Sequence, residues 1–208
     1  MRIDIAIIAG GGEDGRDLYQ ITITGKVVDD TGRGLSERAL NRITRKIQRQ
    51  IERSFSGSGE GIEFETVANI TASSDENPLS DDDHAFRIVD DVAATLGRVN
   101  PVGGEIQGNA PAGQNLIYLQ RGTNYSSTGA HEFGHSAGLA HIRDETEVTQ
   151  AGNFIPLSVN DYPGNLMHQS RDVDQHGNSV AGTRIEPLQI RIMQRKFRNG
   201  QLNQGRQQ

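Results

Sequence analysis

The 208-residue sequence contains no cysteine and no tryptophan. Without cysteine the chain can form no disulfide bond, no thiolate nucleophile and no cysteine-ligated zinc site. A thiolate-based latency switch within the chain is excluded for the same reason. Small secreted animal domains usually depend on disulfides, so this absence favours a bacterial origin.

Long hydrophobic runs are also missing. The apolar stretch at residues 1–8 carries one arginine and ends at Gly10, which is too short for a signal peptide and far too short for a membrane span. The chain is therefore either a cytosolic protein or the mature or delivered part of a longer one. We expect a secreted or delivered bacterial protein, with no signal peptide visible in this chain and no membrane partner.

Apolar residues make up only 34% of the sequence, whereas glycine is frequent, with 25 residues. This composition predicts a modest core with many turns and not a disordered chain, because the apolar residues still recur in regular patterns. The formal net charge of -6 argues against nucleic acid as a partner, since phosphate binding requires a basic face. The length suits a single domain, residues 1–208, which can be split into two lobes by a cleft, and we expect a monomer.

Two periodicities in the sequence predict its secondary structure. Apolar residues that recur every three to four positions predict a helix that begins after the N-cap Ser36 and another that begins at Pro187 and stops at Gly200. Alternation of apolar and polar residues predicts strands at residues 3–8, 21–28, 62–71, 85–92 and 115–120. This order of elements, with an irregular segment at residues 142–182, predicts an α+β fold.

Residues 131–141 read HEFGHSAGLAH and contain the strongest functional signal of the sequence. His131 and His135 are four residues apart, so on a helix both imidazoles project from the same face. Gly138 stands where that helix must end, because glycine can adopt the left-handed conformation that reverses the chain. The reversal can bring His141 to the same metal ion.

Three neutral imidazoles and one water form an open tetrahedral zinc site, which is the arrangement that catalysis requires. Zinc lowers the pKa of its water to about 7 and polarises a substrate carbonyl. Glu132 lies beside the ligands and can accept a proton from that water and pass it to the leaving amine. The alternative, a chance pattern of surface histidines, is disfavoured because the motif also follows a predicted strand.

The motif resembles the HExxHxxGxxH signature of the metzincin metallopeptidases, in which a Met-turn follows. Asn165-Leu166-Met167-His168 stands in the expected place, before the last predicted helix. The resemblance implies that Met167 forms an apolar floor beneath the metal without binding it. It also implies a metzincin-like fold, with a twisted mixed sheet, a backing helix and the active-site helix in residues 1–138, and a smaller irregular lobe with a closing helix in residues 139–208.

Metzincins bind their peptide substrates in an extended form along an edge strand, and the resemblance places that strand within residues 103–113. Two positions depart from the pattern of the family. Gln169 stands two residues after the methionine, where some metzincins have a tyrosine ligand, so we expect no tyrosine to bind the metal. Ile142 follows the third histidine and matches no subfamily, so none is assigned.

Two weaker signals suggest other ligands. Gly10, Gly12 and Gly15 follow a predicted strand in the GxGxxG spacing of a dinucleotide-binding loop, but such a loop requires a helix where residues 18–28 have strand character. We therefore expect a hairpin turn there. The run of aspartates at residues 81–83 offers oxygen ligands for Ca²⁺ without a recognised spacing, so calcium is a secondary possibility.

Other polar residues are interpreted as structural. His84, His168 and His176 are isolated histidines, expected to be structural or exposed. The basic residues on the outer side of the first helix are interpreted as a solvated face, and the alternative is that they bind an acidic partner. These residues are Arg38, Arg42, Arg45, Lys46, Arg49 and Arg53.

The sequence thus predicts a zinc-dependent endopeptidase that hydrolyses extended protein or peptide substrates through a metal-bound water activated by Glu132. His131, His135 and His141 would hold the zinc, with Gly138 and Met167 as structural residues near the site. The first alternative is a non-catalytic zinc-binding module, although such a module has no need for Glu132. The second is a nicotinamide-dependent enzyme, supported by the glycine loop alone.

Overall fold

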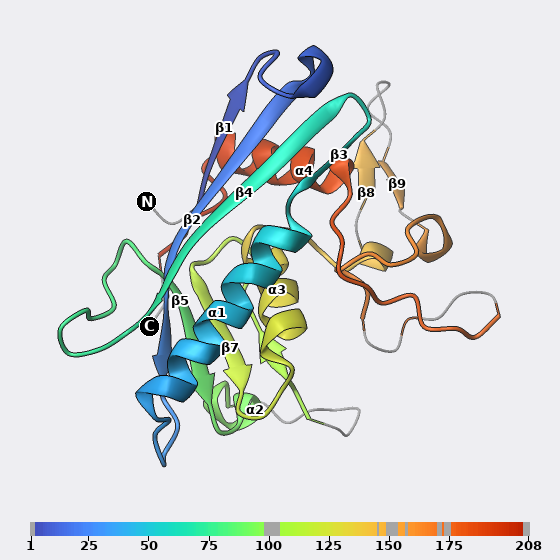
Figure 1. Cartoon of the computed structure of the whole chain (residues 1–208). Coiled ribbons are helices and arrows are strands. Elements are labelled where there is room, and N and C mark those ends of the chain that lie inside the picture. Colours follow the sequence, from blue (N-terminus) through green and yellow to red (C-terminus); the bar gives the residue numbers. More distant parts are fainter. Residues whose placement is uncertain are drawn as a thin grey trace.

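The computed structural model describes residues 3–97, 105–144, 146–148, 154–156, 158–169, 172 and 176–205. A seven-stranded mixed sheet has the order β3-β4-β2-β5-β7-β6, with β1 also paired to β2 (Figure 1). Its strands are β1 (Ile3–Ile8), β2 (Asp17–Asp29), β3 (Gly57–Gly59), β4 (Ile62–Ala72), β5 (His84–Val89), β6 (Gly108–Asn109) and β7 (Leu116–Gln120). The predicted α+β class is confirmed.

The centre of the sheet is parallel and its outer strands are antiparallel. The long strand β2 pairs in parallel with β4 on one side and with β5 on the other, and β5 pairs in parallel with β7. Strands β1, β3 and β6 pair antiparallel with their neighbours. Parallel strands require a crossover connection, which α1 (Glu37–Ser54) supplies between β2 and β4.

Helix α1 begins where the sequence predicts. The hydroxyl of Ser36 accepts a hydrogen bond from the backbone N–H of Ala39 at 3.3 Å, which satisfies one of the free amides of the first turn. The apolar face of the helix, at Leu40, Ile43, Ile47, Ile51 and the following Phe55, is buried. This face packs on β4 and on α3 (Tyr125–Ser136), and the two helices lie side by side (Figure 1).

One hydrophobic core connects the sheet with α1, α3 and α4 (Pro187–Arg198). Helix α4 starts with Pro187 at its first position, and Glu186 and Gln189 form a capping box there. Its buried side chains Ile190 and Met193 belong to the same core as Met167. Helix α4 also contacts the segment that follows the histidine motif, because Gln189 accepts a hydrogen bond from the side chain of Asn165 at 2.7 Å.

Several sequence predictions need correction in detail. The segment 85–92 is not one strand: β5 ends at Val89, and Val92 begins the short helix α2 (Val92–Thr95) because the Asp91 carboxylate caps it, 2.9 Å from the Ala94 amide. The segment 142–182 also contains the hairpin of β8 (Thr146–Val148) and β9 (Phe154–Pro156). It includes the short 3-10 helices η2 (Ile142–Asp144) and η3 (Val159–Asp161) as well.

The glycine loop at residues 10–15 forms a hairpin turn, as expected. It contains the 3-10 turn η1 (Glu13–Gly15) and joins the antiparallel strands β1 and β2, in which Ile8 faces Leu18. Only the three-residue turn η1 follows Gly12, and β2 comes soon after it, so the loop has no α-helix N-terminus to receive a pyrophosphate. In the described part of the chain, no helix has the length and apolarity needed to span a membrane.

Candidate metal centre

The C-terminal end of α3 turns the chain sharply, as the sequence predicts. Gly138 has φ +85°. Its N–H donates to the carbonyl of His135 at 2.8 Å, and the N–H of Leu139 donates to the carbonyl of Gly134 at 2.9 Å. This pair of bonds defines a Schellman motif, which requires the left-handed conformation that glycine adopts without strain. The chain after Gly138 therefore runs back toward the histidine face of the helix.

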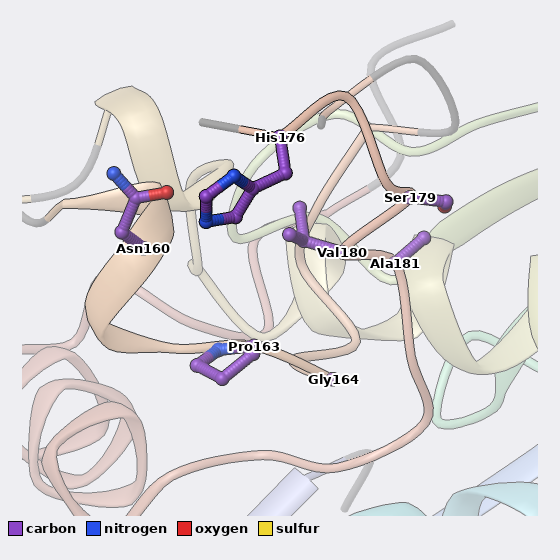
Figure 2. Close-up of a pocket in the computed structure, with 7 residues that line it drawn as sticks. All are labelled: Asn160, Pro163, Gly164, His176, Ser179, Val180 and Ala181. Carbon is purple, nitrogen blue, oxygen red and sulfur yellow. The ribbon is translucent and has the colours of Figure 1, made fainter. Parts of the chain in front are cut away.

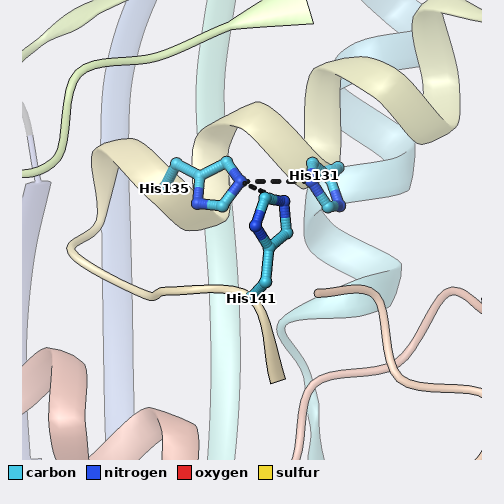
Figure 3. A group of neighbouring side chains, drawn as sticks. All are labelled: His131, His135 and His141. Atoms are coloured by element: carbon cyan, nitrogen blue, oxygen red, sulfur yellow. Dashed lines mark hydrogen bonds between the residues drawn. The ribbon is translucent and has the colours of Figure 1, made fainter. Parts of the chain in front are cut away.

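The reversal brings the three predicted ligands together (Figure 3). The Nε2 atom of His135 lies 3.1 Å from Nε2 of His131 and 3.2 Å from Nε2 of His141. Donors at about 2.0–2.1 Å from a tetrahedral zinc ion are about 3.3 Å apart, so the spacing suits zinc. Among the described residues, these three form the only group of three or more histidine or acidic side chains found with a spacing suited to a metal ion.

The hydrogen-bond partners of Nδ1 in His131 and His135 determine which ring nitrogen carries the proton. Nδ1 of His131 lies 2.7 Å from the carbonyl oxygen of Leu166, and Nδ1 of His135 lies 2.9 Å from that of Leu139. A carbonyl oxygen can only accept, so both Nδ1 atoms carry the proton in the neutral ring. Both Nε2 atoms are then unprotonated, and their lone pairs face one another across the contacts dashed in Figure 3. Lone pairs at this separation repel unless a cation lies between them.

The environment keeps the three imidazoles neutral. Burial lowers the pKa of His131 to about 4, with a further decrease from the neighbouring His135. Burial also lowers the pKa of His135 to about 4, against the opposing effect of its bond to Leu139. The pKa of His141 is lowered by burial and by His131, while the Asp144 carboxylate opposes the decrease. Neutral imidazole is the form that binds a metal, so the site is ready for one at neutral pH.

Glu132 lies on the same helix, next to the edge of the sheet. Only 8% of the residue is exposed, and burial raises the pKa of its carboxyl to about 8, although a hydrogen bond from the backbone of Ala110 opposes this increase. A Cβ atom on Gly108 of β6 would lie 2.8 Å from Glu132 Oε1, so the glycine leaves the space that the carboxylate occupies. Glu132 therefore lies directly against β6.

Strand β6 ends the sheet on that side, so the segment 103–113 does contain an edge strand, at residues 108–109. Residues 103 and 104 lie outside the described part of the chain. That a peptide pairs with this strand stays a prediction.

The segment with Met167 packs against the histidine helix. Met167 is fully buried, and a Cβ atom built on Gly134 would lie 2.4 Å from its sulfur. The side chain of Asn165 holds the turn, because its Oδ1 accepts from the Met167 N–H at 2.8 Å and its Nδ2 donates to Gln189 of α4 at 2.7 Å. The methionine thus packs against α3 at Gly134, and its role as a floor beneath the metal stays a prediction.

Replacement of Gly134 by alanine is expected to destabilise the protein. The new methyl group displaces buried Met167, an overpacking that costs about 1–3 kcal/mol, whereas alanine in a helix regains up to about 1 kcal/mol. Gly129→Ala is the matched control, because its Cβ would meet Ile47 at 3.1 Å, a milder contact in the same helix. Urea unfolding should show a lower midpoint for Gly134→Ala than for Gly129→Ala, and Gly134→Ala/Met167→Ala should lose less stability than the sum of its two single substitutions. Equal midpoints would contradict this packing.

The remaining polar residues singled out in the sequence lie elsewhere. The carboxylate of Asp83 accepts bonds from the backbone N–H of Ser80 at 2.8 Å and its hydroxyl at 2.7 Å, and lies 3.5 Å from the Lys26 ammonium, so the structure gives calcium at residues 81–83 no support. His84 is buried, with Nε2 2.7 Å from the hydroxyl of Ser136, at the end of α3.

His168 is buried, and its Nε2 donates a hydrogen bond to the carbonyl of Tyr162 at 2.8 Å, whereas His176 is exposed. His176 borders a pocket of about 390 Å³, shown in Figure 2. The residues that line this pocket are Asn160, Pro163, Gly164, His176, Ser179, Val180 and Ala181. None of them belongs to the histidine triad, so the pocket is not the candidate metal centre.

The supporting roles of four residues near the site were not predicted from the sequence. Lys196 of α4 donates from its ammonium to the carbonyl of Gly138 and so holds the turn between the second and third histidines. The backbone of Ala110 contacts Glu132, the amide nitrogen of Gln169 lies 3.1 Å from Nδ1 of His141, and Asp172 pairs with Arg143, two residues after that histidine. These contacts join segments distant in the sequence and follow no periodic pattern, so no local signal could have identified them.

Comparisons with known proteins give only distant likenesses. No protein-family model and no curated protein matches the sequence. An archaemetzincin from Methanopyrus kandleri has a similar structure, with a TM-score of 0.45 and 10% identity over 84% of this chain and 96% of that one. A chaperone–substrate complex has a TM-score of 0.40 and 13% identity, over 86% of this chain but only 34% of that chain. Likenesses this distant assign neither a family nor an activity.

Proposed function

We propose that this protein is a zinc-dependent endopeptidase that acts on extended peptide segments. The observation that supports this most is the convergence of the unprotonated Nε2 atoms of His131 and His135, 3.1 Å apart, with His141 Nε2 3.2 Å from the latter. Neutral imidazole donors at this spacing suit zinc, and three protein ligands leave a fourth position free for water or substrate. The HExxHxxGxxH pattern and the following Met167 favour the metzincin clan.

Zinc in such a site supplies Lewis acidity and lowers the pKa of water. The chain supplies the groups that handle protons and substrate. Glu132 follows a ligand directly in sequence, and its carboxylate is the base that takes a proton from the attacking water and delivers it to the leaving amine. The edge strand β6, which lies against Glu132, is the candidate surface for an extended peptide, because main-chain hydrogen bonds can add the peptide to the sheet.

The burial of Glu132 favours an enzyme over an inert zinc-binding module. A carboxyl whose pKa is raised to about 8 by burial opposes folding at neutral pH, because the unfolded chain can ionise it freely. A module that only binds zinc has no use for a buried carboxyl that lowers its folding stability. Ionisable groups that are buried next to a metal site and strongly shifted are typical of catalytic sites.

Removal of the metal tests the proposal. Dialysis against a chelator should abolish cleavage of a mixed peptide library, and about one equivalent of zinc per chain should restore it. Zinc should also raise the thermal midpoint, since a ligand at 100 times its dissociation constant stabilises the folded state by about 2.7 kcal/mol. Magnesium at the same concentration is the control, because it prefers oxygen ligands and should restore nothing.

The possible outcomes separate the alternatives. Zinc binding and stabilisation without cleavage of any library peptide would identify an inert module and refute the peptidase. Failure to bind zinc at all would refute the metal centre as well.

A further inference from the structure

The third histidine is held differently from the other two. His131 and His135 belong to α3 and have backbone carbonyls as partners for Nδ1. His141 lies beyond the helix, and its Nδ1 faces the side-chain amide of Gln169, with the amide nitrogen at 3.1 Å. The ring of His141 therefore depends on a side chain for its orientation.

The protonation of the His141 ring decides whether the amide oxygen or the amide nitrogen of Gln169 can be the partner of Nδ1. Nε2 of His141 points to the other two histidines, so in the metal-bound form Nδ1 must carry the proton and donate it. A rotation of about 180° exchanges the nitrogen and oxygen of an amide with little change in shape, and the oxygen is the end that accepts. We propose that Gln169 is a positioning residue whose amide oxygen accepts the Nδ1–H of His141 and aims its Nε2 at the metal. This inference rests on the proposed zinc centre.

One other side chain competes for the same proton. The carboxylate of Asp144 lies 3.7 Å from Nδ1 of His141, and its side chain is 60% exposed. That distance is too long for a hydrogen bond, and water competes for an exposed carboxylate. Gln169 is closer, so it is the favoured partner.

Gln169 is itself held in place by a buried carboxylate. Asp172 is 1% exposed, and its Oδ2 accepts from the backbone N–H of Gln169 at 2.8 Å. The other oxygen, Oδ1, pairs with the guanidinium of Arg143, which follows His141 by two residues. The same carboxylate therefore fixes both the segment that carries the ligand and the segment that carries its acceptor.

The backbone adds a further connection between these segments. The N–H of Ile142, the residue after the third histidine, donates to the carbonyl of Met167 at 3.2 Å. The segments that carry His141 and Gln169 are thus joined by two further contacts, from Ile142 to Met167 and from Arg143 to Asp172. Such preorganisation limits the entropy lost when the third ligand binds the metal.

Substitutions at positions 169 and 144 of the full-length protein test the assignment. Gln169→Leu removes the acceptor, and Gln169→Asn shortens it by one methylene group, so both should weaken zinc binding by about 10–100-fold. Gln169→Glu keeps an acceptor at the same reach and should bind zinc at least as tightly as the wild type. Asp144→Asn is the matched control and should change the affinity by less than about twofold.

Zinc affinity is measured by competition with a chromophoric chelator, without any substrate. Cobalt(II) absorption reports the ligand geometry, and thermal unfolding of the metal-free variants reports folding. We expect weaker zinc binding in the leucine and asparagine variants, with metal-free unfolding close to that of the wild type. Wild-type affinity in both variants, or a larger loss in Asp144→Asn, would overturn the assignment.

The test separates this inference from the proposed activity. A wild-type protein that binds zinc but cleaves no peptide refutes the peptidase and leaves the role of Gln169 measurable. A wild-type protein that binds no zinc overturns both.

Discussion

Replacement of Glu132 by glutamine is expected to reduce peptide cleavage by at least the ~10²–10⁴-fold that follows the loss of a general acid–base group. Glutamine keeps the shape of the side chain but cannot take a proton from water. The three histidines and the groups that face their Nδ1 atoms are untouched, so zinc content should stay at the wild-type level. Glu132→Ala should be equally inactive, because it also removes the proton acceptor.

Glu132→Gln should also stabilise the metal-free protein, by an amount that depends on pH. The folded pKa of Glu132, about 8, lies above the ordinary value of 4.5, so the unfolded chain releases a proton that the folded chain retains between these values. Wild-type stability therefore falls as pH rises from 4.5 to 8, and Glu132→Gln is exempt from this loss. The advantage of the variant should be on the order of 2–4 kcal/mol at pH 8 and vanish near pH 4.5.

Chemical denaturation of the chelator-treated proteins between pH 4.5 and 8 measures this difference. Saturating zinc should diminish it, because a nearby divalent cation favours the ionised carboxylate. Glu65→Gln is the matched control, since Glu65 is an exposed carboxylate on β4, and it should leave both cleavage and stability unchanged. Full activity in Glu132→Gln would exclude Glu132 as the base, and equal stability at pH 8 would contradict its burial.

Replacement of His141 by alanine should nearly abolish zinc binding. It removes one of three protein ligands, so the loss of affinity should exceed the ~10–100-fold that follows the loss of a ligand's hydrogen-bonding partner. Two histidines on one helix turn remain, but they cannot complete a three-ligand site. The stabilisation that zinc gives the wild type should disappear with the affinity.

Competition with a chelator and zinc-dependent thermal unfolding measure this effect. His176→Ala is the control, because His176 is an exposed histidine that lies outside the triad. It should retain the wild-type affinity. If His141→Ala binds zinc as tightly as the wild type, the third ligand is assigned wrongly.

Elements governed by local rules were predictable. The apolar period of α1 and its cap at Ser36 depend on neighbours three or four residues away, and both are confirmed. The reversal at Gly138 depends on the left-handed conformation of a single glycine, and it is confirmed as well. The strand expected at residues 85–92 was partly wrong, because Asp91 caps a helix that interrupts the apolar run.

What the sequence by itself determined is the identity and spacing of the candidate ligands, since His131 and His135 must share a helix face and Gly138 permits the return of His141. Only the tertiary structure decided how these side chains are oriented and charged. The carbonyl of Leu166 reaches His131 across 35 positions of the chain, and Gln169 reaches His141 across 28. The pKa of Glu132 depends on its burial against β6. Contacts of this kind arise from packing between distant segments, where no periodic pattern records which residues will meet.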